Sequence, residues 1–382
     1  MWLKRKPCSG KLLPLLVMFL VVGLAVVGCV GTGAIPKGWS GGIVADGTLF
    51  MASMEGRLVA INIADGSHQL SEPLKISASG GGFGCTPAPT TVAIYGPPAV
   101  SGDSVYIGGY NGKVYVFNSS SLKMNDDYPP EGNLEPIVGG LVVALDQVYF
   151  GSSDGKVYAL SIDPLEKKWD FQTGDKIWST PVIDGDTLYI GSFDKKLYAL
   201  SAADGMEKWE FETGGAIAST PLVYNNTVYV GSFDRYLYAV DAINGKQVWR
   251  FPAEDEADNR PENWFWTKPV AYNNTIYAGN LDGKLYILNA ETGDEIVAAV
   301  DLESPISSWP VSVDDSIIVA SEEGVLYAID TDSNQKSELG NLEEEVFAAL
   351  SASEEIVYIH TEKDALYAVD TQTGALRELY IE

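Results

Sequence analysis

The sequence predicts an all-β chain that folds as an eight-bladed β-propeller of four-stranded antiparallel blades over residues 39–382. The main observation is a short pattern that occurs eight times, at intervals of 40 to 56 residues. The first of two neighbouring strands carries a large apolar residue at Phe50, Tyr106, Tyr149, Tyr189, Tyr229, Tyr277, Ile318 and Tyr358. Nine residues later, the second strand carries Val59, Tyr115, Tyr158, Tyr198, Tyr238, Tyr286, Tyr327 and Tyr367. Repeats of about 40 residues made of short strands are typical of propellers, with one blade per repeat.

Each repeat also contains the turns that connect the strands of a blade. Asn-Asn pairs such as Asn225-Asn226 supply the positive φ angles of a two-residue turn between the first two strands. Asp-Gly pairs such as Asp154-Gly155 do the same between the second and third strands. The strands are continuously apolar, which is typical of a sheet covered on both faces. We therefore expect the blades to stack in a ring, with no helix after the N-terminal segment.

Three repeats carry a further motif, Ala239-x-Asp241-x-x-x-Gly245-Lys246-x-x-Trp249, with Trp209 and Trp169 at the corresponding places. This motif resembles the tryptophan-docking motif of the pyrroloquinoline-quinone (PQQ) repeat family of eight-bladed propellers. In that family the outer-strand tryptophan packs against the next blade, so the resemblance implies a blade-docking role for Trp169, Trp209 and Trp249. The other repeats place Leu70, Val297, Glu338 and Glu378 there. We expect the ring to be best locked at blades 3 to 5 and looser towards its closure.

The N-terminal segment predicts export. A basic segment, residues 4–11, precedes an apolar run over residues 12–27, as in a secretory signal. The run ends in Val26-Val-Gly-Cys29, which resembles a bacterial lipobox. This resemblance implies a lipoprotein signal peptide over residues 1–28, lipidation of Cys29 and an acylated tether over residues 29–38. The alternative is an uncleaved membrane helix. Either way, the propeller lies outside the cytoplasm and is attached to a bacterial membrane.

Charge and cysteine content narrow the possible partners. The chain has 52 acidic and 25 basic residues, so phosphate backbones repel it and nucleic acid binding is excluded. Basic or neutral protein surfaces are the expected partners, and membrane contact depends on the N-terminal lipid anchor. Of the three cysteines, Cys8 and Cys29 belong to the N-terminal segment. Only Cys85 remains, so an internal disulfide is impossible.

The residues expected of a quinone-dependent or multi-histidine zinc enzyme are missing from the sequence, and no segment resembles the nucleophile elbow of a Ser-His-Asp hydrolase. PQQ-dependent dehydrogenases share the blade motif, but that family also carries adjacent cysteines, an acidic calcium site and a catalytic aspartate, and we find no matching positions. The two histidines, His68 and His360, cannot form a multi-histidine zinc site. The acidic stretch 254–258 lacks the spacing of a calcium loop. The sequence predicts no catalytic residues, no metal and no cofactor.

Two long connections and a set of aromatic residues indicate a binding face. Residues 71–97 and 252–267 connect an outer strand to the next inner strand, and both fall on the face that carries the turns between second and third strands. At one position before the inner strand, five of eight repeats are aromatic: Trp39, Tyr95, Trp178, Trp266 and Phe347. Trp264 and Trp309 lie close by. These rings either pack the long connections onto the inner strands or bind a partner at the channel mouth.

A lipid-anchored propeller of this length resembles the family of lipoproteins that assist β-barrel assembly at bacterial outer membranes. The resemblance implies a scaffold that holds another protein on one face. The leading interpretation is therefore a non-enzymatic protein-protein scaffold of the cell envelope. A module that binds a small ligand or a saccharide at the aromatic mouth is the alternative. The third interpretation is that the chain is a PQQ-dependent dehydrogenase.

Overall fold

The computed structural model describes residues 38–76, 90–253 and 260–381. The predicted signal peptide, Cys29, the tether up to residue 37, Cys85 and the acidic stretch 254–258 lie outside the described residues. In the part of the chain that the structure describes, no helix is long and apolar enough to cross a membrane.

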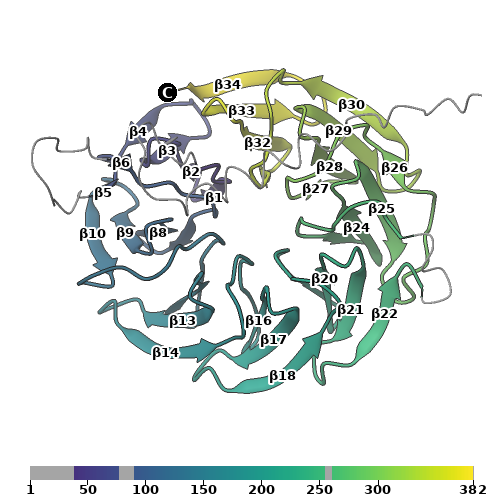
Figure 1. Cartoon of the computed structure of the whole chain (residues 1–382). Helices are drawn as coiled ribbons and strands as arrows, with labels where there is room; N and C mark the ends of the chain where they lie inside the picture. Colours follow the sequence, from purple (N-terminus) through teal and green to yellow (C-terminus); the bar gives the residue numbers. More distant parts are fainter. Residues whose placement is uncertain (1–37, 77–89, 254–259, 382) are drawn as a thin grey trace, which may run out of the picture. The chain divides into compact units, whose positions relative to one another are not determined.

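The described strands form eight four-stranded antiparallel sheets, one per repeat, and the predicted propeller is confirmed (Figure 1). Within each sheet the strands follow sequence order from the channel to the rim. A small two-stranded ribbon, β5 (Lys75–Ile76) and β6 (Thr90–Thr91), is inserted between blades 1 and 2.

The strand bounds are as follows. Blade 1 contains β1 (Ile43–Ala45), β2 (Thr48–Ala52), β3 (Leu58–Asn62) and β4 (His68–Leu70), and blade 2 contains β7 (Ala99–Ser101), β8 (Ser104–Gly108), β9 (Val114–Asn118) and β10 (Met124–Tyr128). Blade 3 contains β11 (Val142–Ala144), β12 (Gln147–Gly151), β13 (Lys156–Ser161) and β14 (Lys167–Gln172), and blade 4 contains β15 (Val182–Asp184), β16 (Thr187–Gly191), β17 (Lys196–Ser201) and β18 (Glu207–Glu212). Blade 5 contains β19 (Leu222–Tyr224), β20 (Thr227–Gly231), β21 (Leu237–Asp241) and β22 (Gln247–Phe251), and blade 6 contains β23 (Val270–Tyr272), β24 (Thr275–Gly279), β25 (Lys284–Asn289) and β26 (Val300–Asp301). Blade 7 contains β27 (Val311–Val313), β28 (Ser316–Ala320), β29 (Val325–Asp330) and β30 (Lys336–Asn341), and blade 8 contains β31 (Ser351–Ser353), β32 (Ile356–His360), β33 (Ala365–Asp370) and β34 (Leu376–Ile381).

The innermost strands form a closed ring. Contacts run in order through β1, β7, β11, β15, β19, β23, β27 and β31, and β31 contacts β1. Eight buried hydrophobic clusters lie between the blades, one at each interface. Between blades 4 and 5, for example, Leu197 packs with Val228 and Tyr238. Because neighbouring blades cover both faces of every sheet, the central strands are apolar on both sides.

The three predicted docking tryptophans lie at interfaces between blades. Trp209 on β18 is buried, and its Nε1 donates a hydrogen bond to the carbonyl oxygen of Ala242 in blade 5 (3.0 Å). The hydroxyl of Tyr189 donates to the same oxygen (3.2 Å). Gly245, in the same turn, lies over the indole, where an added Cβ would approach a ring atom to 2.8 Å. The same arrangement occurs for Trp169 with Ala202 and for Trp249 with Ala290.

In blades 7 and 8 a leucine, and not the glutamate aligned with the tryptophans, packs at the corresponding interface. The alignment puts Glu338 and Glu378 at the tryptophan position, but both are exposed. In blades 3 to 5 the bulge of the outer strand precedes the tryptophan, whereas in blades 7 and 8 it follows the glutamate. This shift turns the residue after the glutamate towards the neighbouring blade. Leu339 packs on the core between blades 7 and 8, and Leu379 on the core between blades 8 and 1.

Blades 8 and 1 close the ring without sharing a strand, where the yellow and purple parts of Figure 1 meet. Leu49 and Met51 of blade 1 form one buried cluster with Tyr358 and Leu366 of blade 8. Both histidines of the chain lie at this interface. His68 on β4 is exposed and its ring contacts Tyr380 edge to face, with 5.5 Å between the ring centres.

A buried polar network joins the same two blades. The Nδ1 of His360 lies 2.8 Å from the carbonyl oxygen of Ser40, and its Nε2 lies 2.7 Å from Oδ1 of Asp364. The Asp364 carboxylate also accepts a hydrogen bond from the backbone N–H of Met54 (3.0 Å). Since a carbonyl oxygen only accepts, Nδ1 carries a hydrogen. Apolar packing and hydrogen bonds thus act together at the closure.

Truncation of a docking tryptophan is expected to destabilise the ring. Replacing Trp209 by Ala removes a buried ring and should lower the free energy of unfolding by about 3–5 kcal/mol. Trp209→Phe keeps most of the apolar contact and loses the hydrogen bond to Ala242, at a cost of about 1 kcal/mol from that bond. Denaturant unfolding of both variants measures the difference. Equal stability of Trp209→Ala and the native chain would contradict the docking role.

The two histidines provide a matched pair for the closure. His360→Ala leaves the Asp364 carboxylate and the Ser40 carbonyl without their buried partner, and should cost about 3–5 kcal/mol of unfolding free energy. His68→Ala removes only an exposed ring contact and should cost less than about 1 kcal/mol. Thermal unfolding at neutral pH compares them. If the two variants unfold together, the network does not stabilise the closure.

Candidate partner-binding face

One face of the propeller carries two kinds of connection, which we call together the loop face. They are the turns between the second and third strands and the connections from each outer strand to the next inner strand. Backbone hydrogen bonds join the two kinds directly. The N–H of Phe193 donates to the carbonyl of Lys176 (3.0 Å), and that of Phe233 donates to the carbonyl of Ala216 (2.9 Å). Residues distant in sequence therefore lie side by side on this face.

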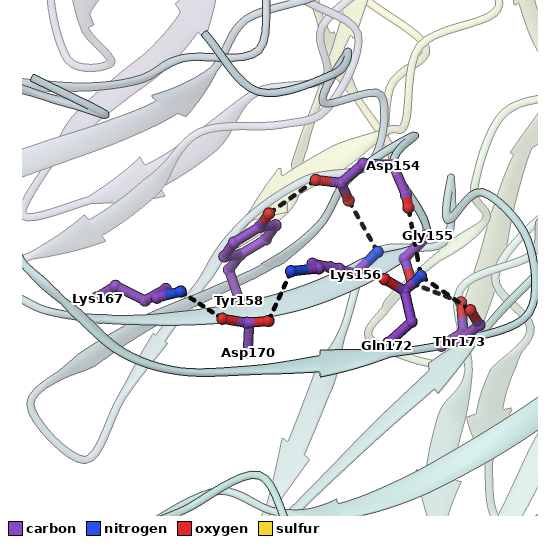
Figure 2. A network of polar contacts seen from close by, with 8 residues as sticks. All are labelled: Asp154, Gly155, Lys156, Tyr158, Lys167, Asp170, Gln172 and Thr173. Atoms are coloured by element: carbon purple, nitrogen blue, oxygen red, sulfur yellow. Dashed lines mark hydrogen bonds and ion pairs between the residues drawn. The ribbon is translucent and has the colours of Figure 1, made fainter. Parts of the chain in front are cut away.

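An aspartate holds the turn between second and third strands in blades 3 to 6. Figure 2 shows Asp154 of blade 3, whose Oδ1 accepts a hydrogen bond from the N–H of Lys156 (2.9 Å) and whose Oδ2 accepts one from the hydroxyl of Tyr158 (2.7 Å). Burial, with this hydrogen bond to Asp154, raises the pKa of Tyr158. Thr173 of the next connection donates to the carbonyl of Gly155 (2.8 Å). The same aspartate–tyrosine bond occurs in Asp194–Tyr198, Asp234–Tyr238 and Asp282–Tyr286.

Five rings from blades 4 to 6 form what we call the large aromatic cluster: Trp178, Phe193, Phe233, Trp264 and Trp266. Trp178 meets Phe193 edge to face (4.7 Å between ring centres), and Phe193 meets Phe233 in the same way (5.7 Å). Phe233 stacks on Trp264 (4.4 Å) and on Trp266 (5.7 Å). All five side chains are partly exposed. The cluster is thus a continuous aromatic surface that solvent reaches.

A second group, the small aromatic cluster, lies at blades 8, 1 and 2. Trp39 meets Tyr95 edge to face (4.7 Å) and Phe347 at a tilt (5.6 Å). Tyr95 also meets Tyr110, at 5.5 Å. Burial raises the pKa of Tyr95 to about 12, with a smaller contribution from Tyr110. All four rings are partly exposed, so they belong to the same face without forming part of the core.

Blades 7 and 8 carry carboxylates on the loop face. Glu322, Glu345 and Glu362, the glutamate cluster, come from two turns and the connection between blades 7 and 8. The N–H of Glu362 donates to the carbonyl of Glu345 (2.9 Å). Burial raises the pKa of Glu322 to about 7, and the charge of Glu345 adds to the effect. Burial, followed by the charges of Glu362 and Glu323, also raises the pKa of Glu345. A positive charge placed here would relieve this repulsion.

Comparison with known proteins identifies the family. A family model described as outer membrane protein assembly factor BamB matches residues 39–171 and 163–377. The chain belongs to this family. It is a propeller of the PQQ-repeat type, as the docking motif predicts.

Solved structures share the fold at low sequence identity. BamB from Moraxella catarrhalis is 16% identical, with a TM-score of 0.69, and the match covers 86% of this chain and 93% of that one. The crystal structure of the computationally designed Ika8 protein is 15% identical, with a TM-score of 0.71, and the match covers 87% of this chain and 96% of that one. No curated protein matches the sequence significantly.

The predicted aromatic residues do not form one continuous circle around the channel mouth. The structure places most of them in two separate clusters. Trp178, Trp264 and Trp266 join the large cluster, and Trp39, Tyr95 and Phe347 join the small one. Trp309 joins neither cluster and lines a cavity together with residues of the inner strands of blades 5 to 8. The described residues contain no group of three or more acidic, histidine or cysteine side chains placed to hold a metal ion.

Three rings that contact the predicted aromatic residues were not predicted from the sequence. Phe193, Phe233 and Tyr110 occupy the middle of the turns between second and third strands, next to the residues that build the turn. The Gly-Ser-Phe-Asp tetrapeptide at residues 191–194 and 231–234 carries the signal. Its glycine, serine and aspartate have structural roles, but the phenylalanine does not need to be aromatic for the turn to form. Alignment of the repeats by face would have placed it beside the predicted tryptophans.

The raised pKa of Glu322 predicts a dependence of stability on pH. The carboxyl takes up its proton below about pH 7 in the folded chain but only near pH 4.5 when unfolded. Its stabilising contribution is therefore complete below pH 4.5 and is lost as the pH rises to about 7. Glu322→Gln removes this loss and should be more stable than the native chain at pH 8, by on the order of 1–3 kcal/mol, but not at pH 4. Glu323→Gln, at an exposed neighbour, is the control. A constant difference between pH 4 and 8 would contradict the assignment.

Proposed function

We propose that this chain is a non-enzymatic, lipid-anchored scaffold outside the cytoplasm that binds an envelope protein through its loop face, in the assembly of outer-membrane proteins. The observation that carries the proposal is the large aromatic cluster. Interfaces are rich in tryptophan and tyrosine because rigid rings bury much area at a small cost in conformational entropy. Here five rings from three blades meet on one surface and stay partly exposed.

The position of the rings supports a binding role over a packing role. A ring that only packed a connection onto an inner strand would be buried by that contact. Phe233 instead protrudes from a turn that hydrogen bonds already hold, through Asp234 and the backbone of Ala216. Its ring contacts are with Phe193 of the preceding blade and with two tryptophans of the next blade, all within the large aromatic cluster. The turn therefore presents the ring, and the ring contributes little to the turn.

Charge on the same face narrows the chemistry of the partner. The glutamate cluster flanks Phe347 of the small aromatic cluster along the chain, with Glu345 two residues before it. A lysine or arginine of a partner placed there would lower the raised pKa values of Glu322 and Glu345 and gain binding energy from the change. A partner surface with apolar and basic side chains fits both features. The acidic composition of the chain disfavours nucleic acid as a partner, because the carboxylates repel its phosphate groups.

The N-terminal segment and the family support the location and the role. The lipobox-like sequence ending in Cys29 supports an acyl anchor, and the family description names outer membrane protein assembly. The absence from the sequence of the adjacent cysteines and the acidic calcium set of the quinone dehydrogenases supports a role without catalysis.

The loop face can be tested in native membranes. The full chain is cross-linked in its host and captured, and the β-barrel assembly proteins that copurify are quantified by mass spectrometry. Combined Phe233→Ala and Trp266→Ala should reduce their recovery at least about tenfold, because central interface rings carry most of the binding energy. Ile243→Ala is the control, since Ile243 is exposed in a turn of the opposite face.

Thermal unfolding of each variant accompanies the capture, so that loss of binding is distinguished from loss of folding. Undiminished recovery with the folded double variant would contradict the assignment of the binding face. A native chain that recovers no β-barrel assembly protein would contradict the proposed role itself.

A further inference from the structure

The central channel contains a cavity of about 370 Å³ between blades 5 and 8. Most of the side chains that line it are apolar, and they include Leu222, Val270 and Leu350 from three inner strands or their starts. Trp309, two residues before β27, forms part of the same wall and is partly exposed. The volume is within the range of small-molecule pockets, roughly 300–1,000 Å³. The cavity is distinct from the aromatic clusters of the loop face.

A single charged side chain, Lys268, lines this cavity. It lies two residues before β23, at the position that Trp309 occupies in the next blade. Burial lowers the pKa of Lys268, and no charged group of the described residues offsets the effect. A buried ammonium is normally paired with a carboxylate because desolvation disfavours its charge. Although the chain has 52 acidic residues, no carboxylate of the described residues is paired with Lys268 in the cavity.

We propose that the channel binds a carboxylate that is attached to an apolar or aromatic group. The ammonium of Lys268 pairs with the carboxylate, and the indole of Trp309 and the aliphatic wall contact the apolar group. The ligand supplies the counter-charge that the described residues do not provide, and its apolar part removes the apolar side chains of the wall from water. This site does not depend on the docking of a protein at the loop face.

The composition of the wall selects this chemistry over others. A phosphate group needs several donors for its oxygens, usually arginines or backbone N–H groups. The side chains of the cavity offer one ammonium and one hydroxyl, that of Ser312. Saccharide sites usually hold the sugar with several polar side chains, and only these two line the cavity. Lys268 is the one charged side chain among the described residues that line the cavity.

The carboxylate could come from a free organic acid or from the C-terminus of a peptide. The test therefore uses N-acetyl-L-phenylalanine and the tripeptide Ala-Ala-Phe, each compared with its C-terminal amide, in calorimetric titrations of the full chain. Both acids share the same terminal group and ring. Binding of both acids assigns the site to peptide C-termini as well as small acids, and binding of the small acid alone assigns it to free acids.

Three variants test the named residues. Lys268→Met keeps the length of the side chain without its charge and should weaken acid binding at least tenfold, whereas Lys268→Arg should stay within about threefold of the native chain. Trp309→Ala should weaken binding of the acids and remove the part of the tryptophan fluorescence change that accompanies it. The amides should bind at least tenfold more weakly than the acids.

Two further outcomes decide the proposal. In alkaline buffer, binding of the acid should be accompanied by proton uptake, because the carboxylate raises the lowered pKa of Lys268. Equal affinity of the acid for the native chain and Lys268→Met would overturn the proposal, and so would the absence of binding by both acids.

Discussion

Each blade of this chain has two apolar faces, and only a neighbouring blade can cover them. The ring must therefore close, or blades 1 and 8 would each expose one face. Closure is demanding here because no blade combines strands from both ends of the chain. The interface between these blades contains a buried cluster around Met51 and Leu366, and a hydrogen-bond network through His360. An open ring would leave the apolar faces of blades 1 and 8 in water.

The same geometry creates the functional surface. Strand order within a blade brings the turns between second and third strands and the long connections to one face. Aspartates such as Asp154 and Asp234 fix these turns, so the residues beside them are held without contributing to the core. The turn does not require a particular residue directly before its aspartate, and blades 4 and 5 carry Phe193 and Phe233 at that position. The loop face, which we propose to bind a partner, can therefore vary in composition without changing the packing that maintains the ring.

The channel and the loop face differ in the interactions they offer. The loop face presents rings that are shared between blades and carboxylates that repel one another, which favours a large apolar and basic partner. The channel presents one ammonium against an apolar wall, which favours a small anionic group. Lys268 and Trp309 occupy equivalent places in neighbouring repeats, where most other blades have small residues such as Gly140 and Thr220. The repeat thus tolerates large side chains at this position where the channel has room for them.

The periodicity of the sequence determined the number of blades, the strands and turns of each blade, and three docking tryptophans, because these follow from local patterns that recur every 40 to 56 residues. Six of the seven predicted aromatic residues lie on the loop face, as the repeat pattern indicates. The tertiary structure alone decided the rest. Leu339 and Leu379 pack inward because a bulge moved by one residue, which the alignment of repeats does not register. The two aromatic clusters, the contact of His360 with Ser40 and the position of Lys268 in the channel wall all depend on which residues of different blades meet. These contacts are particular to single pairs of blades, so the repeated strand and turn pattern does not specify them.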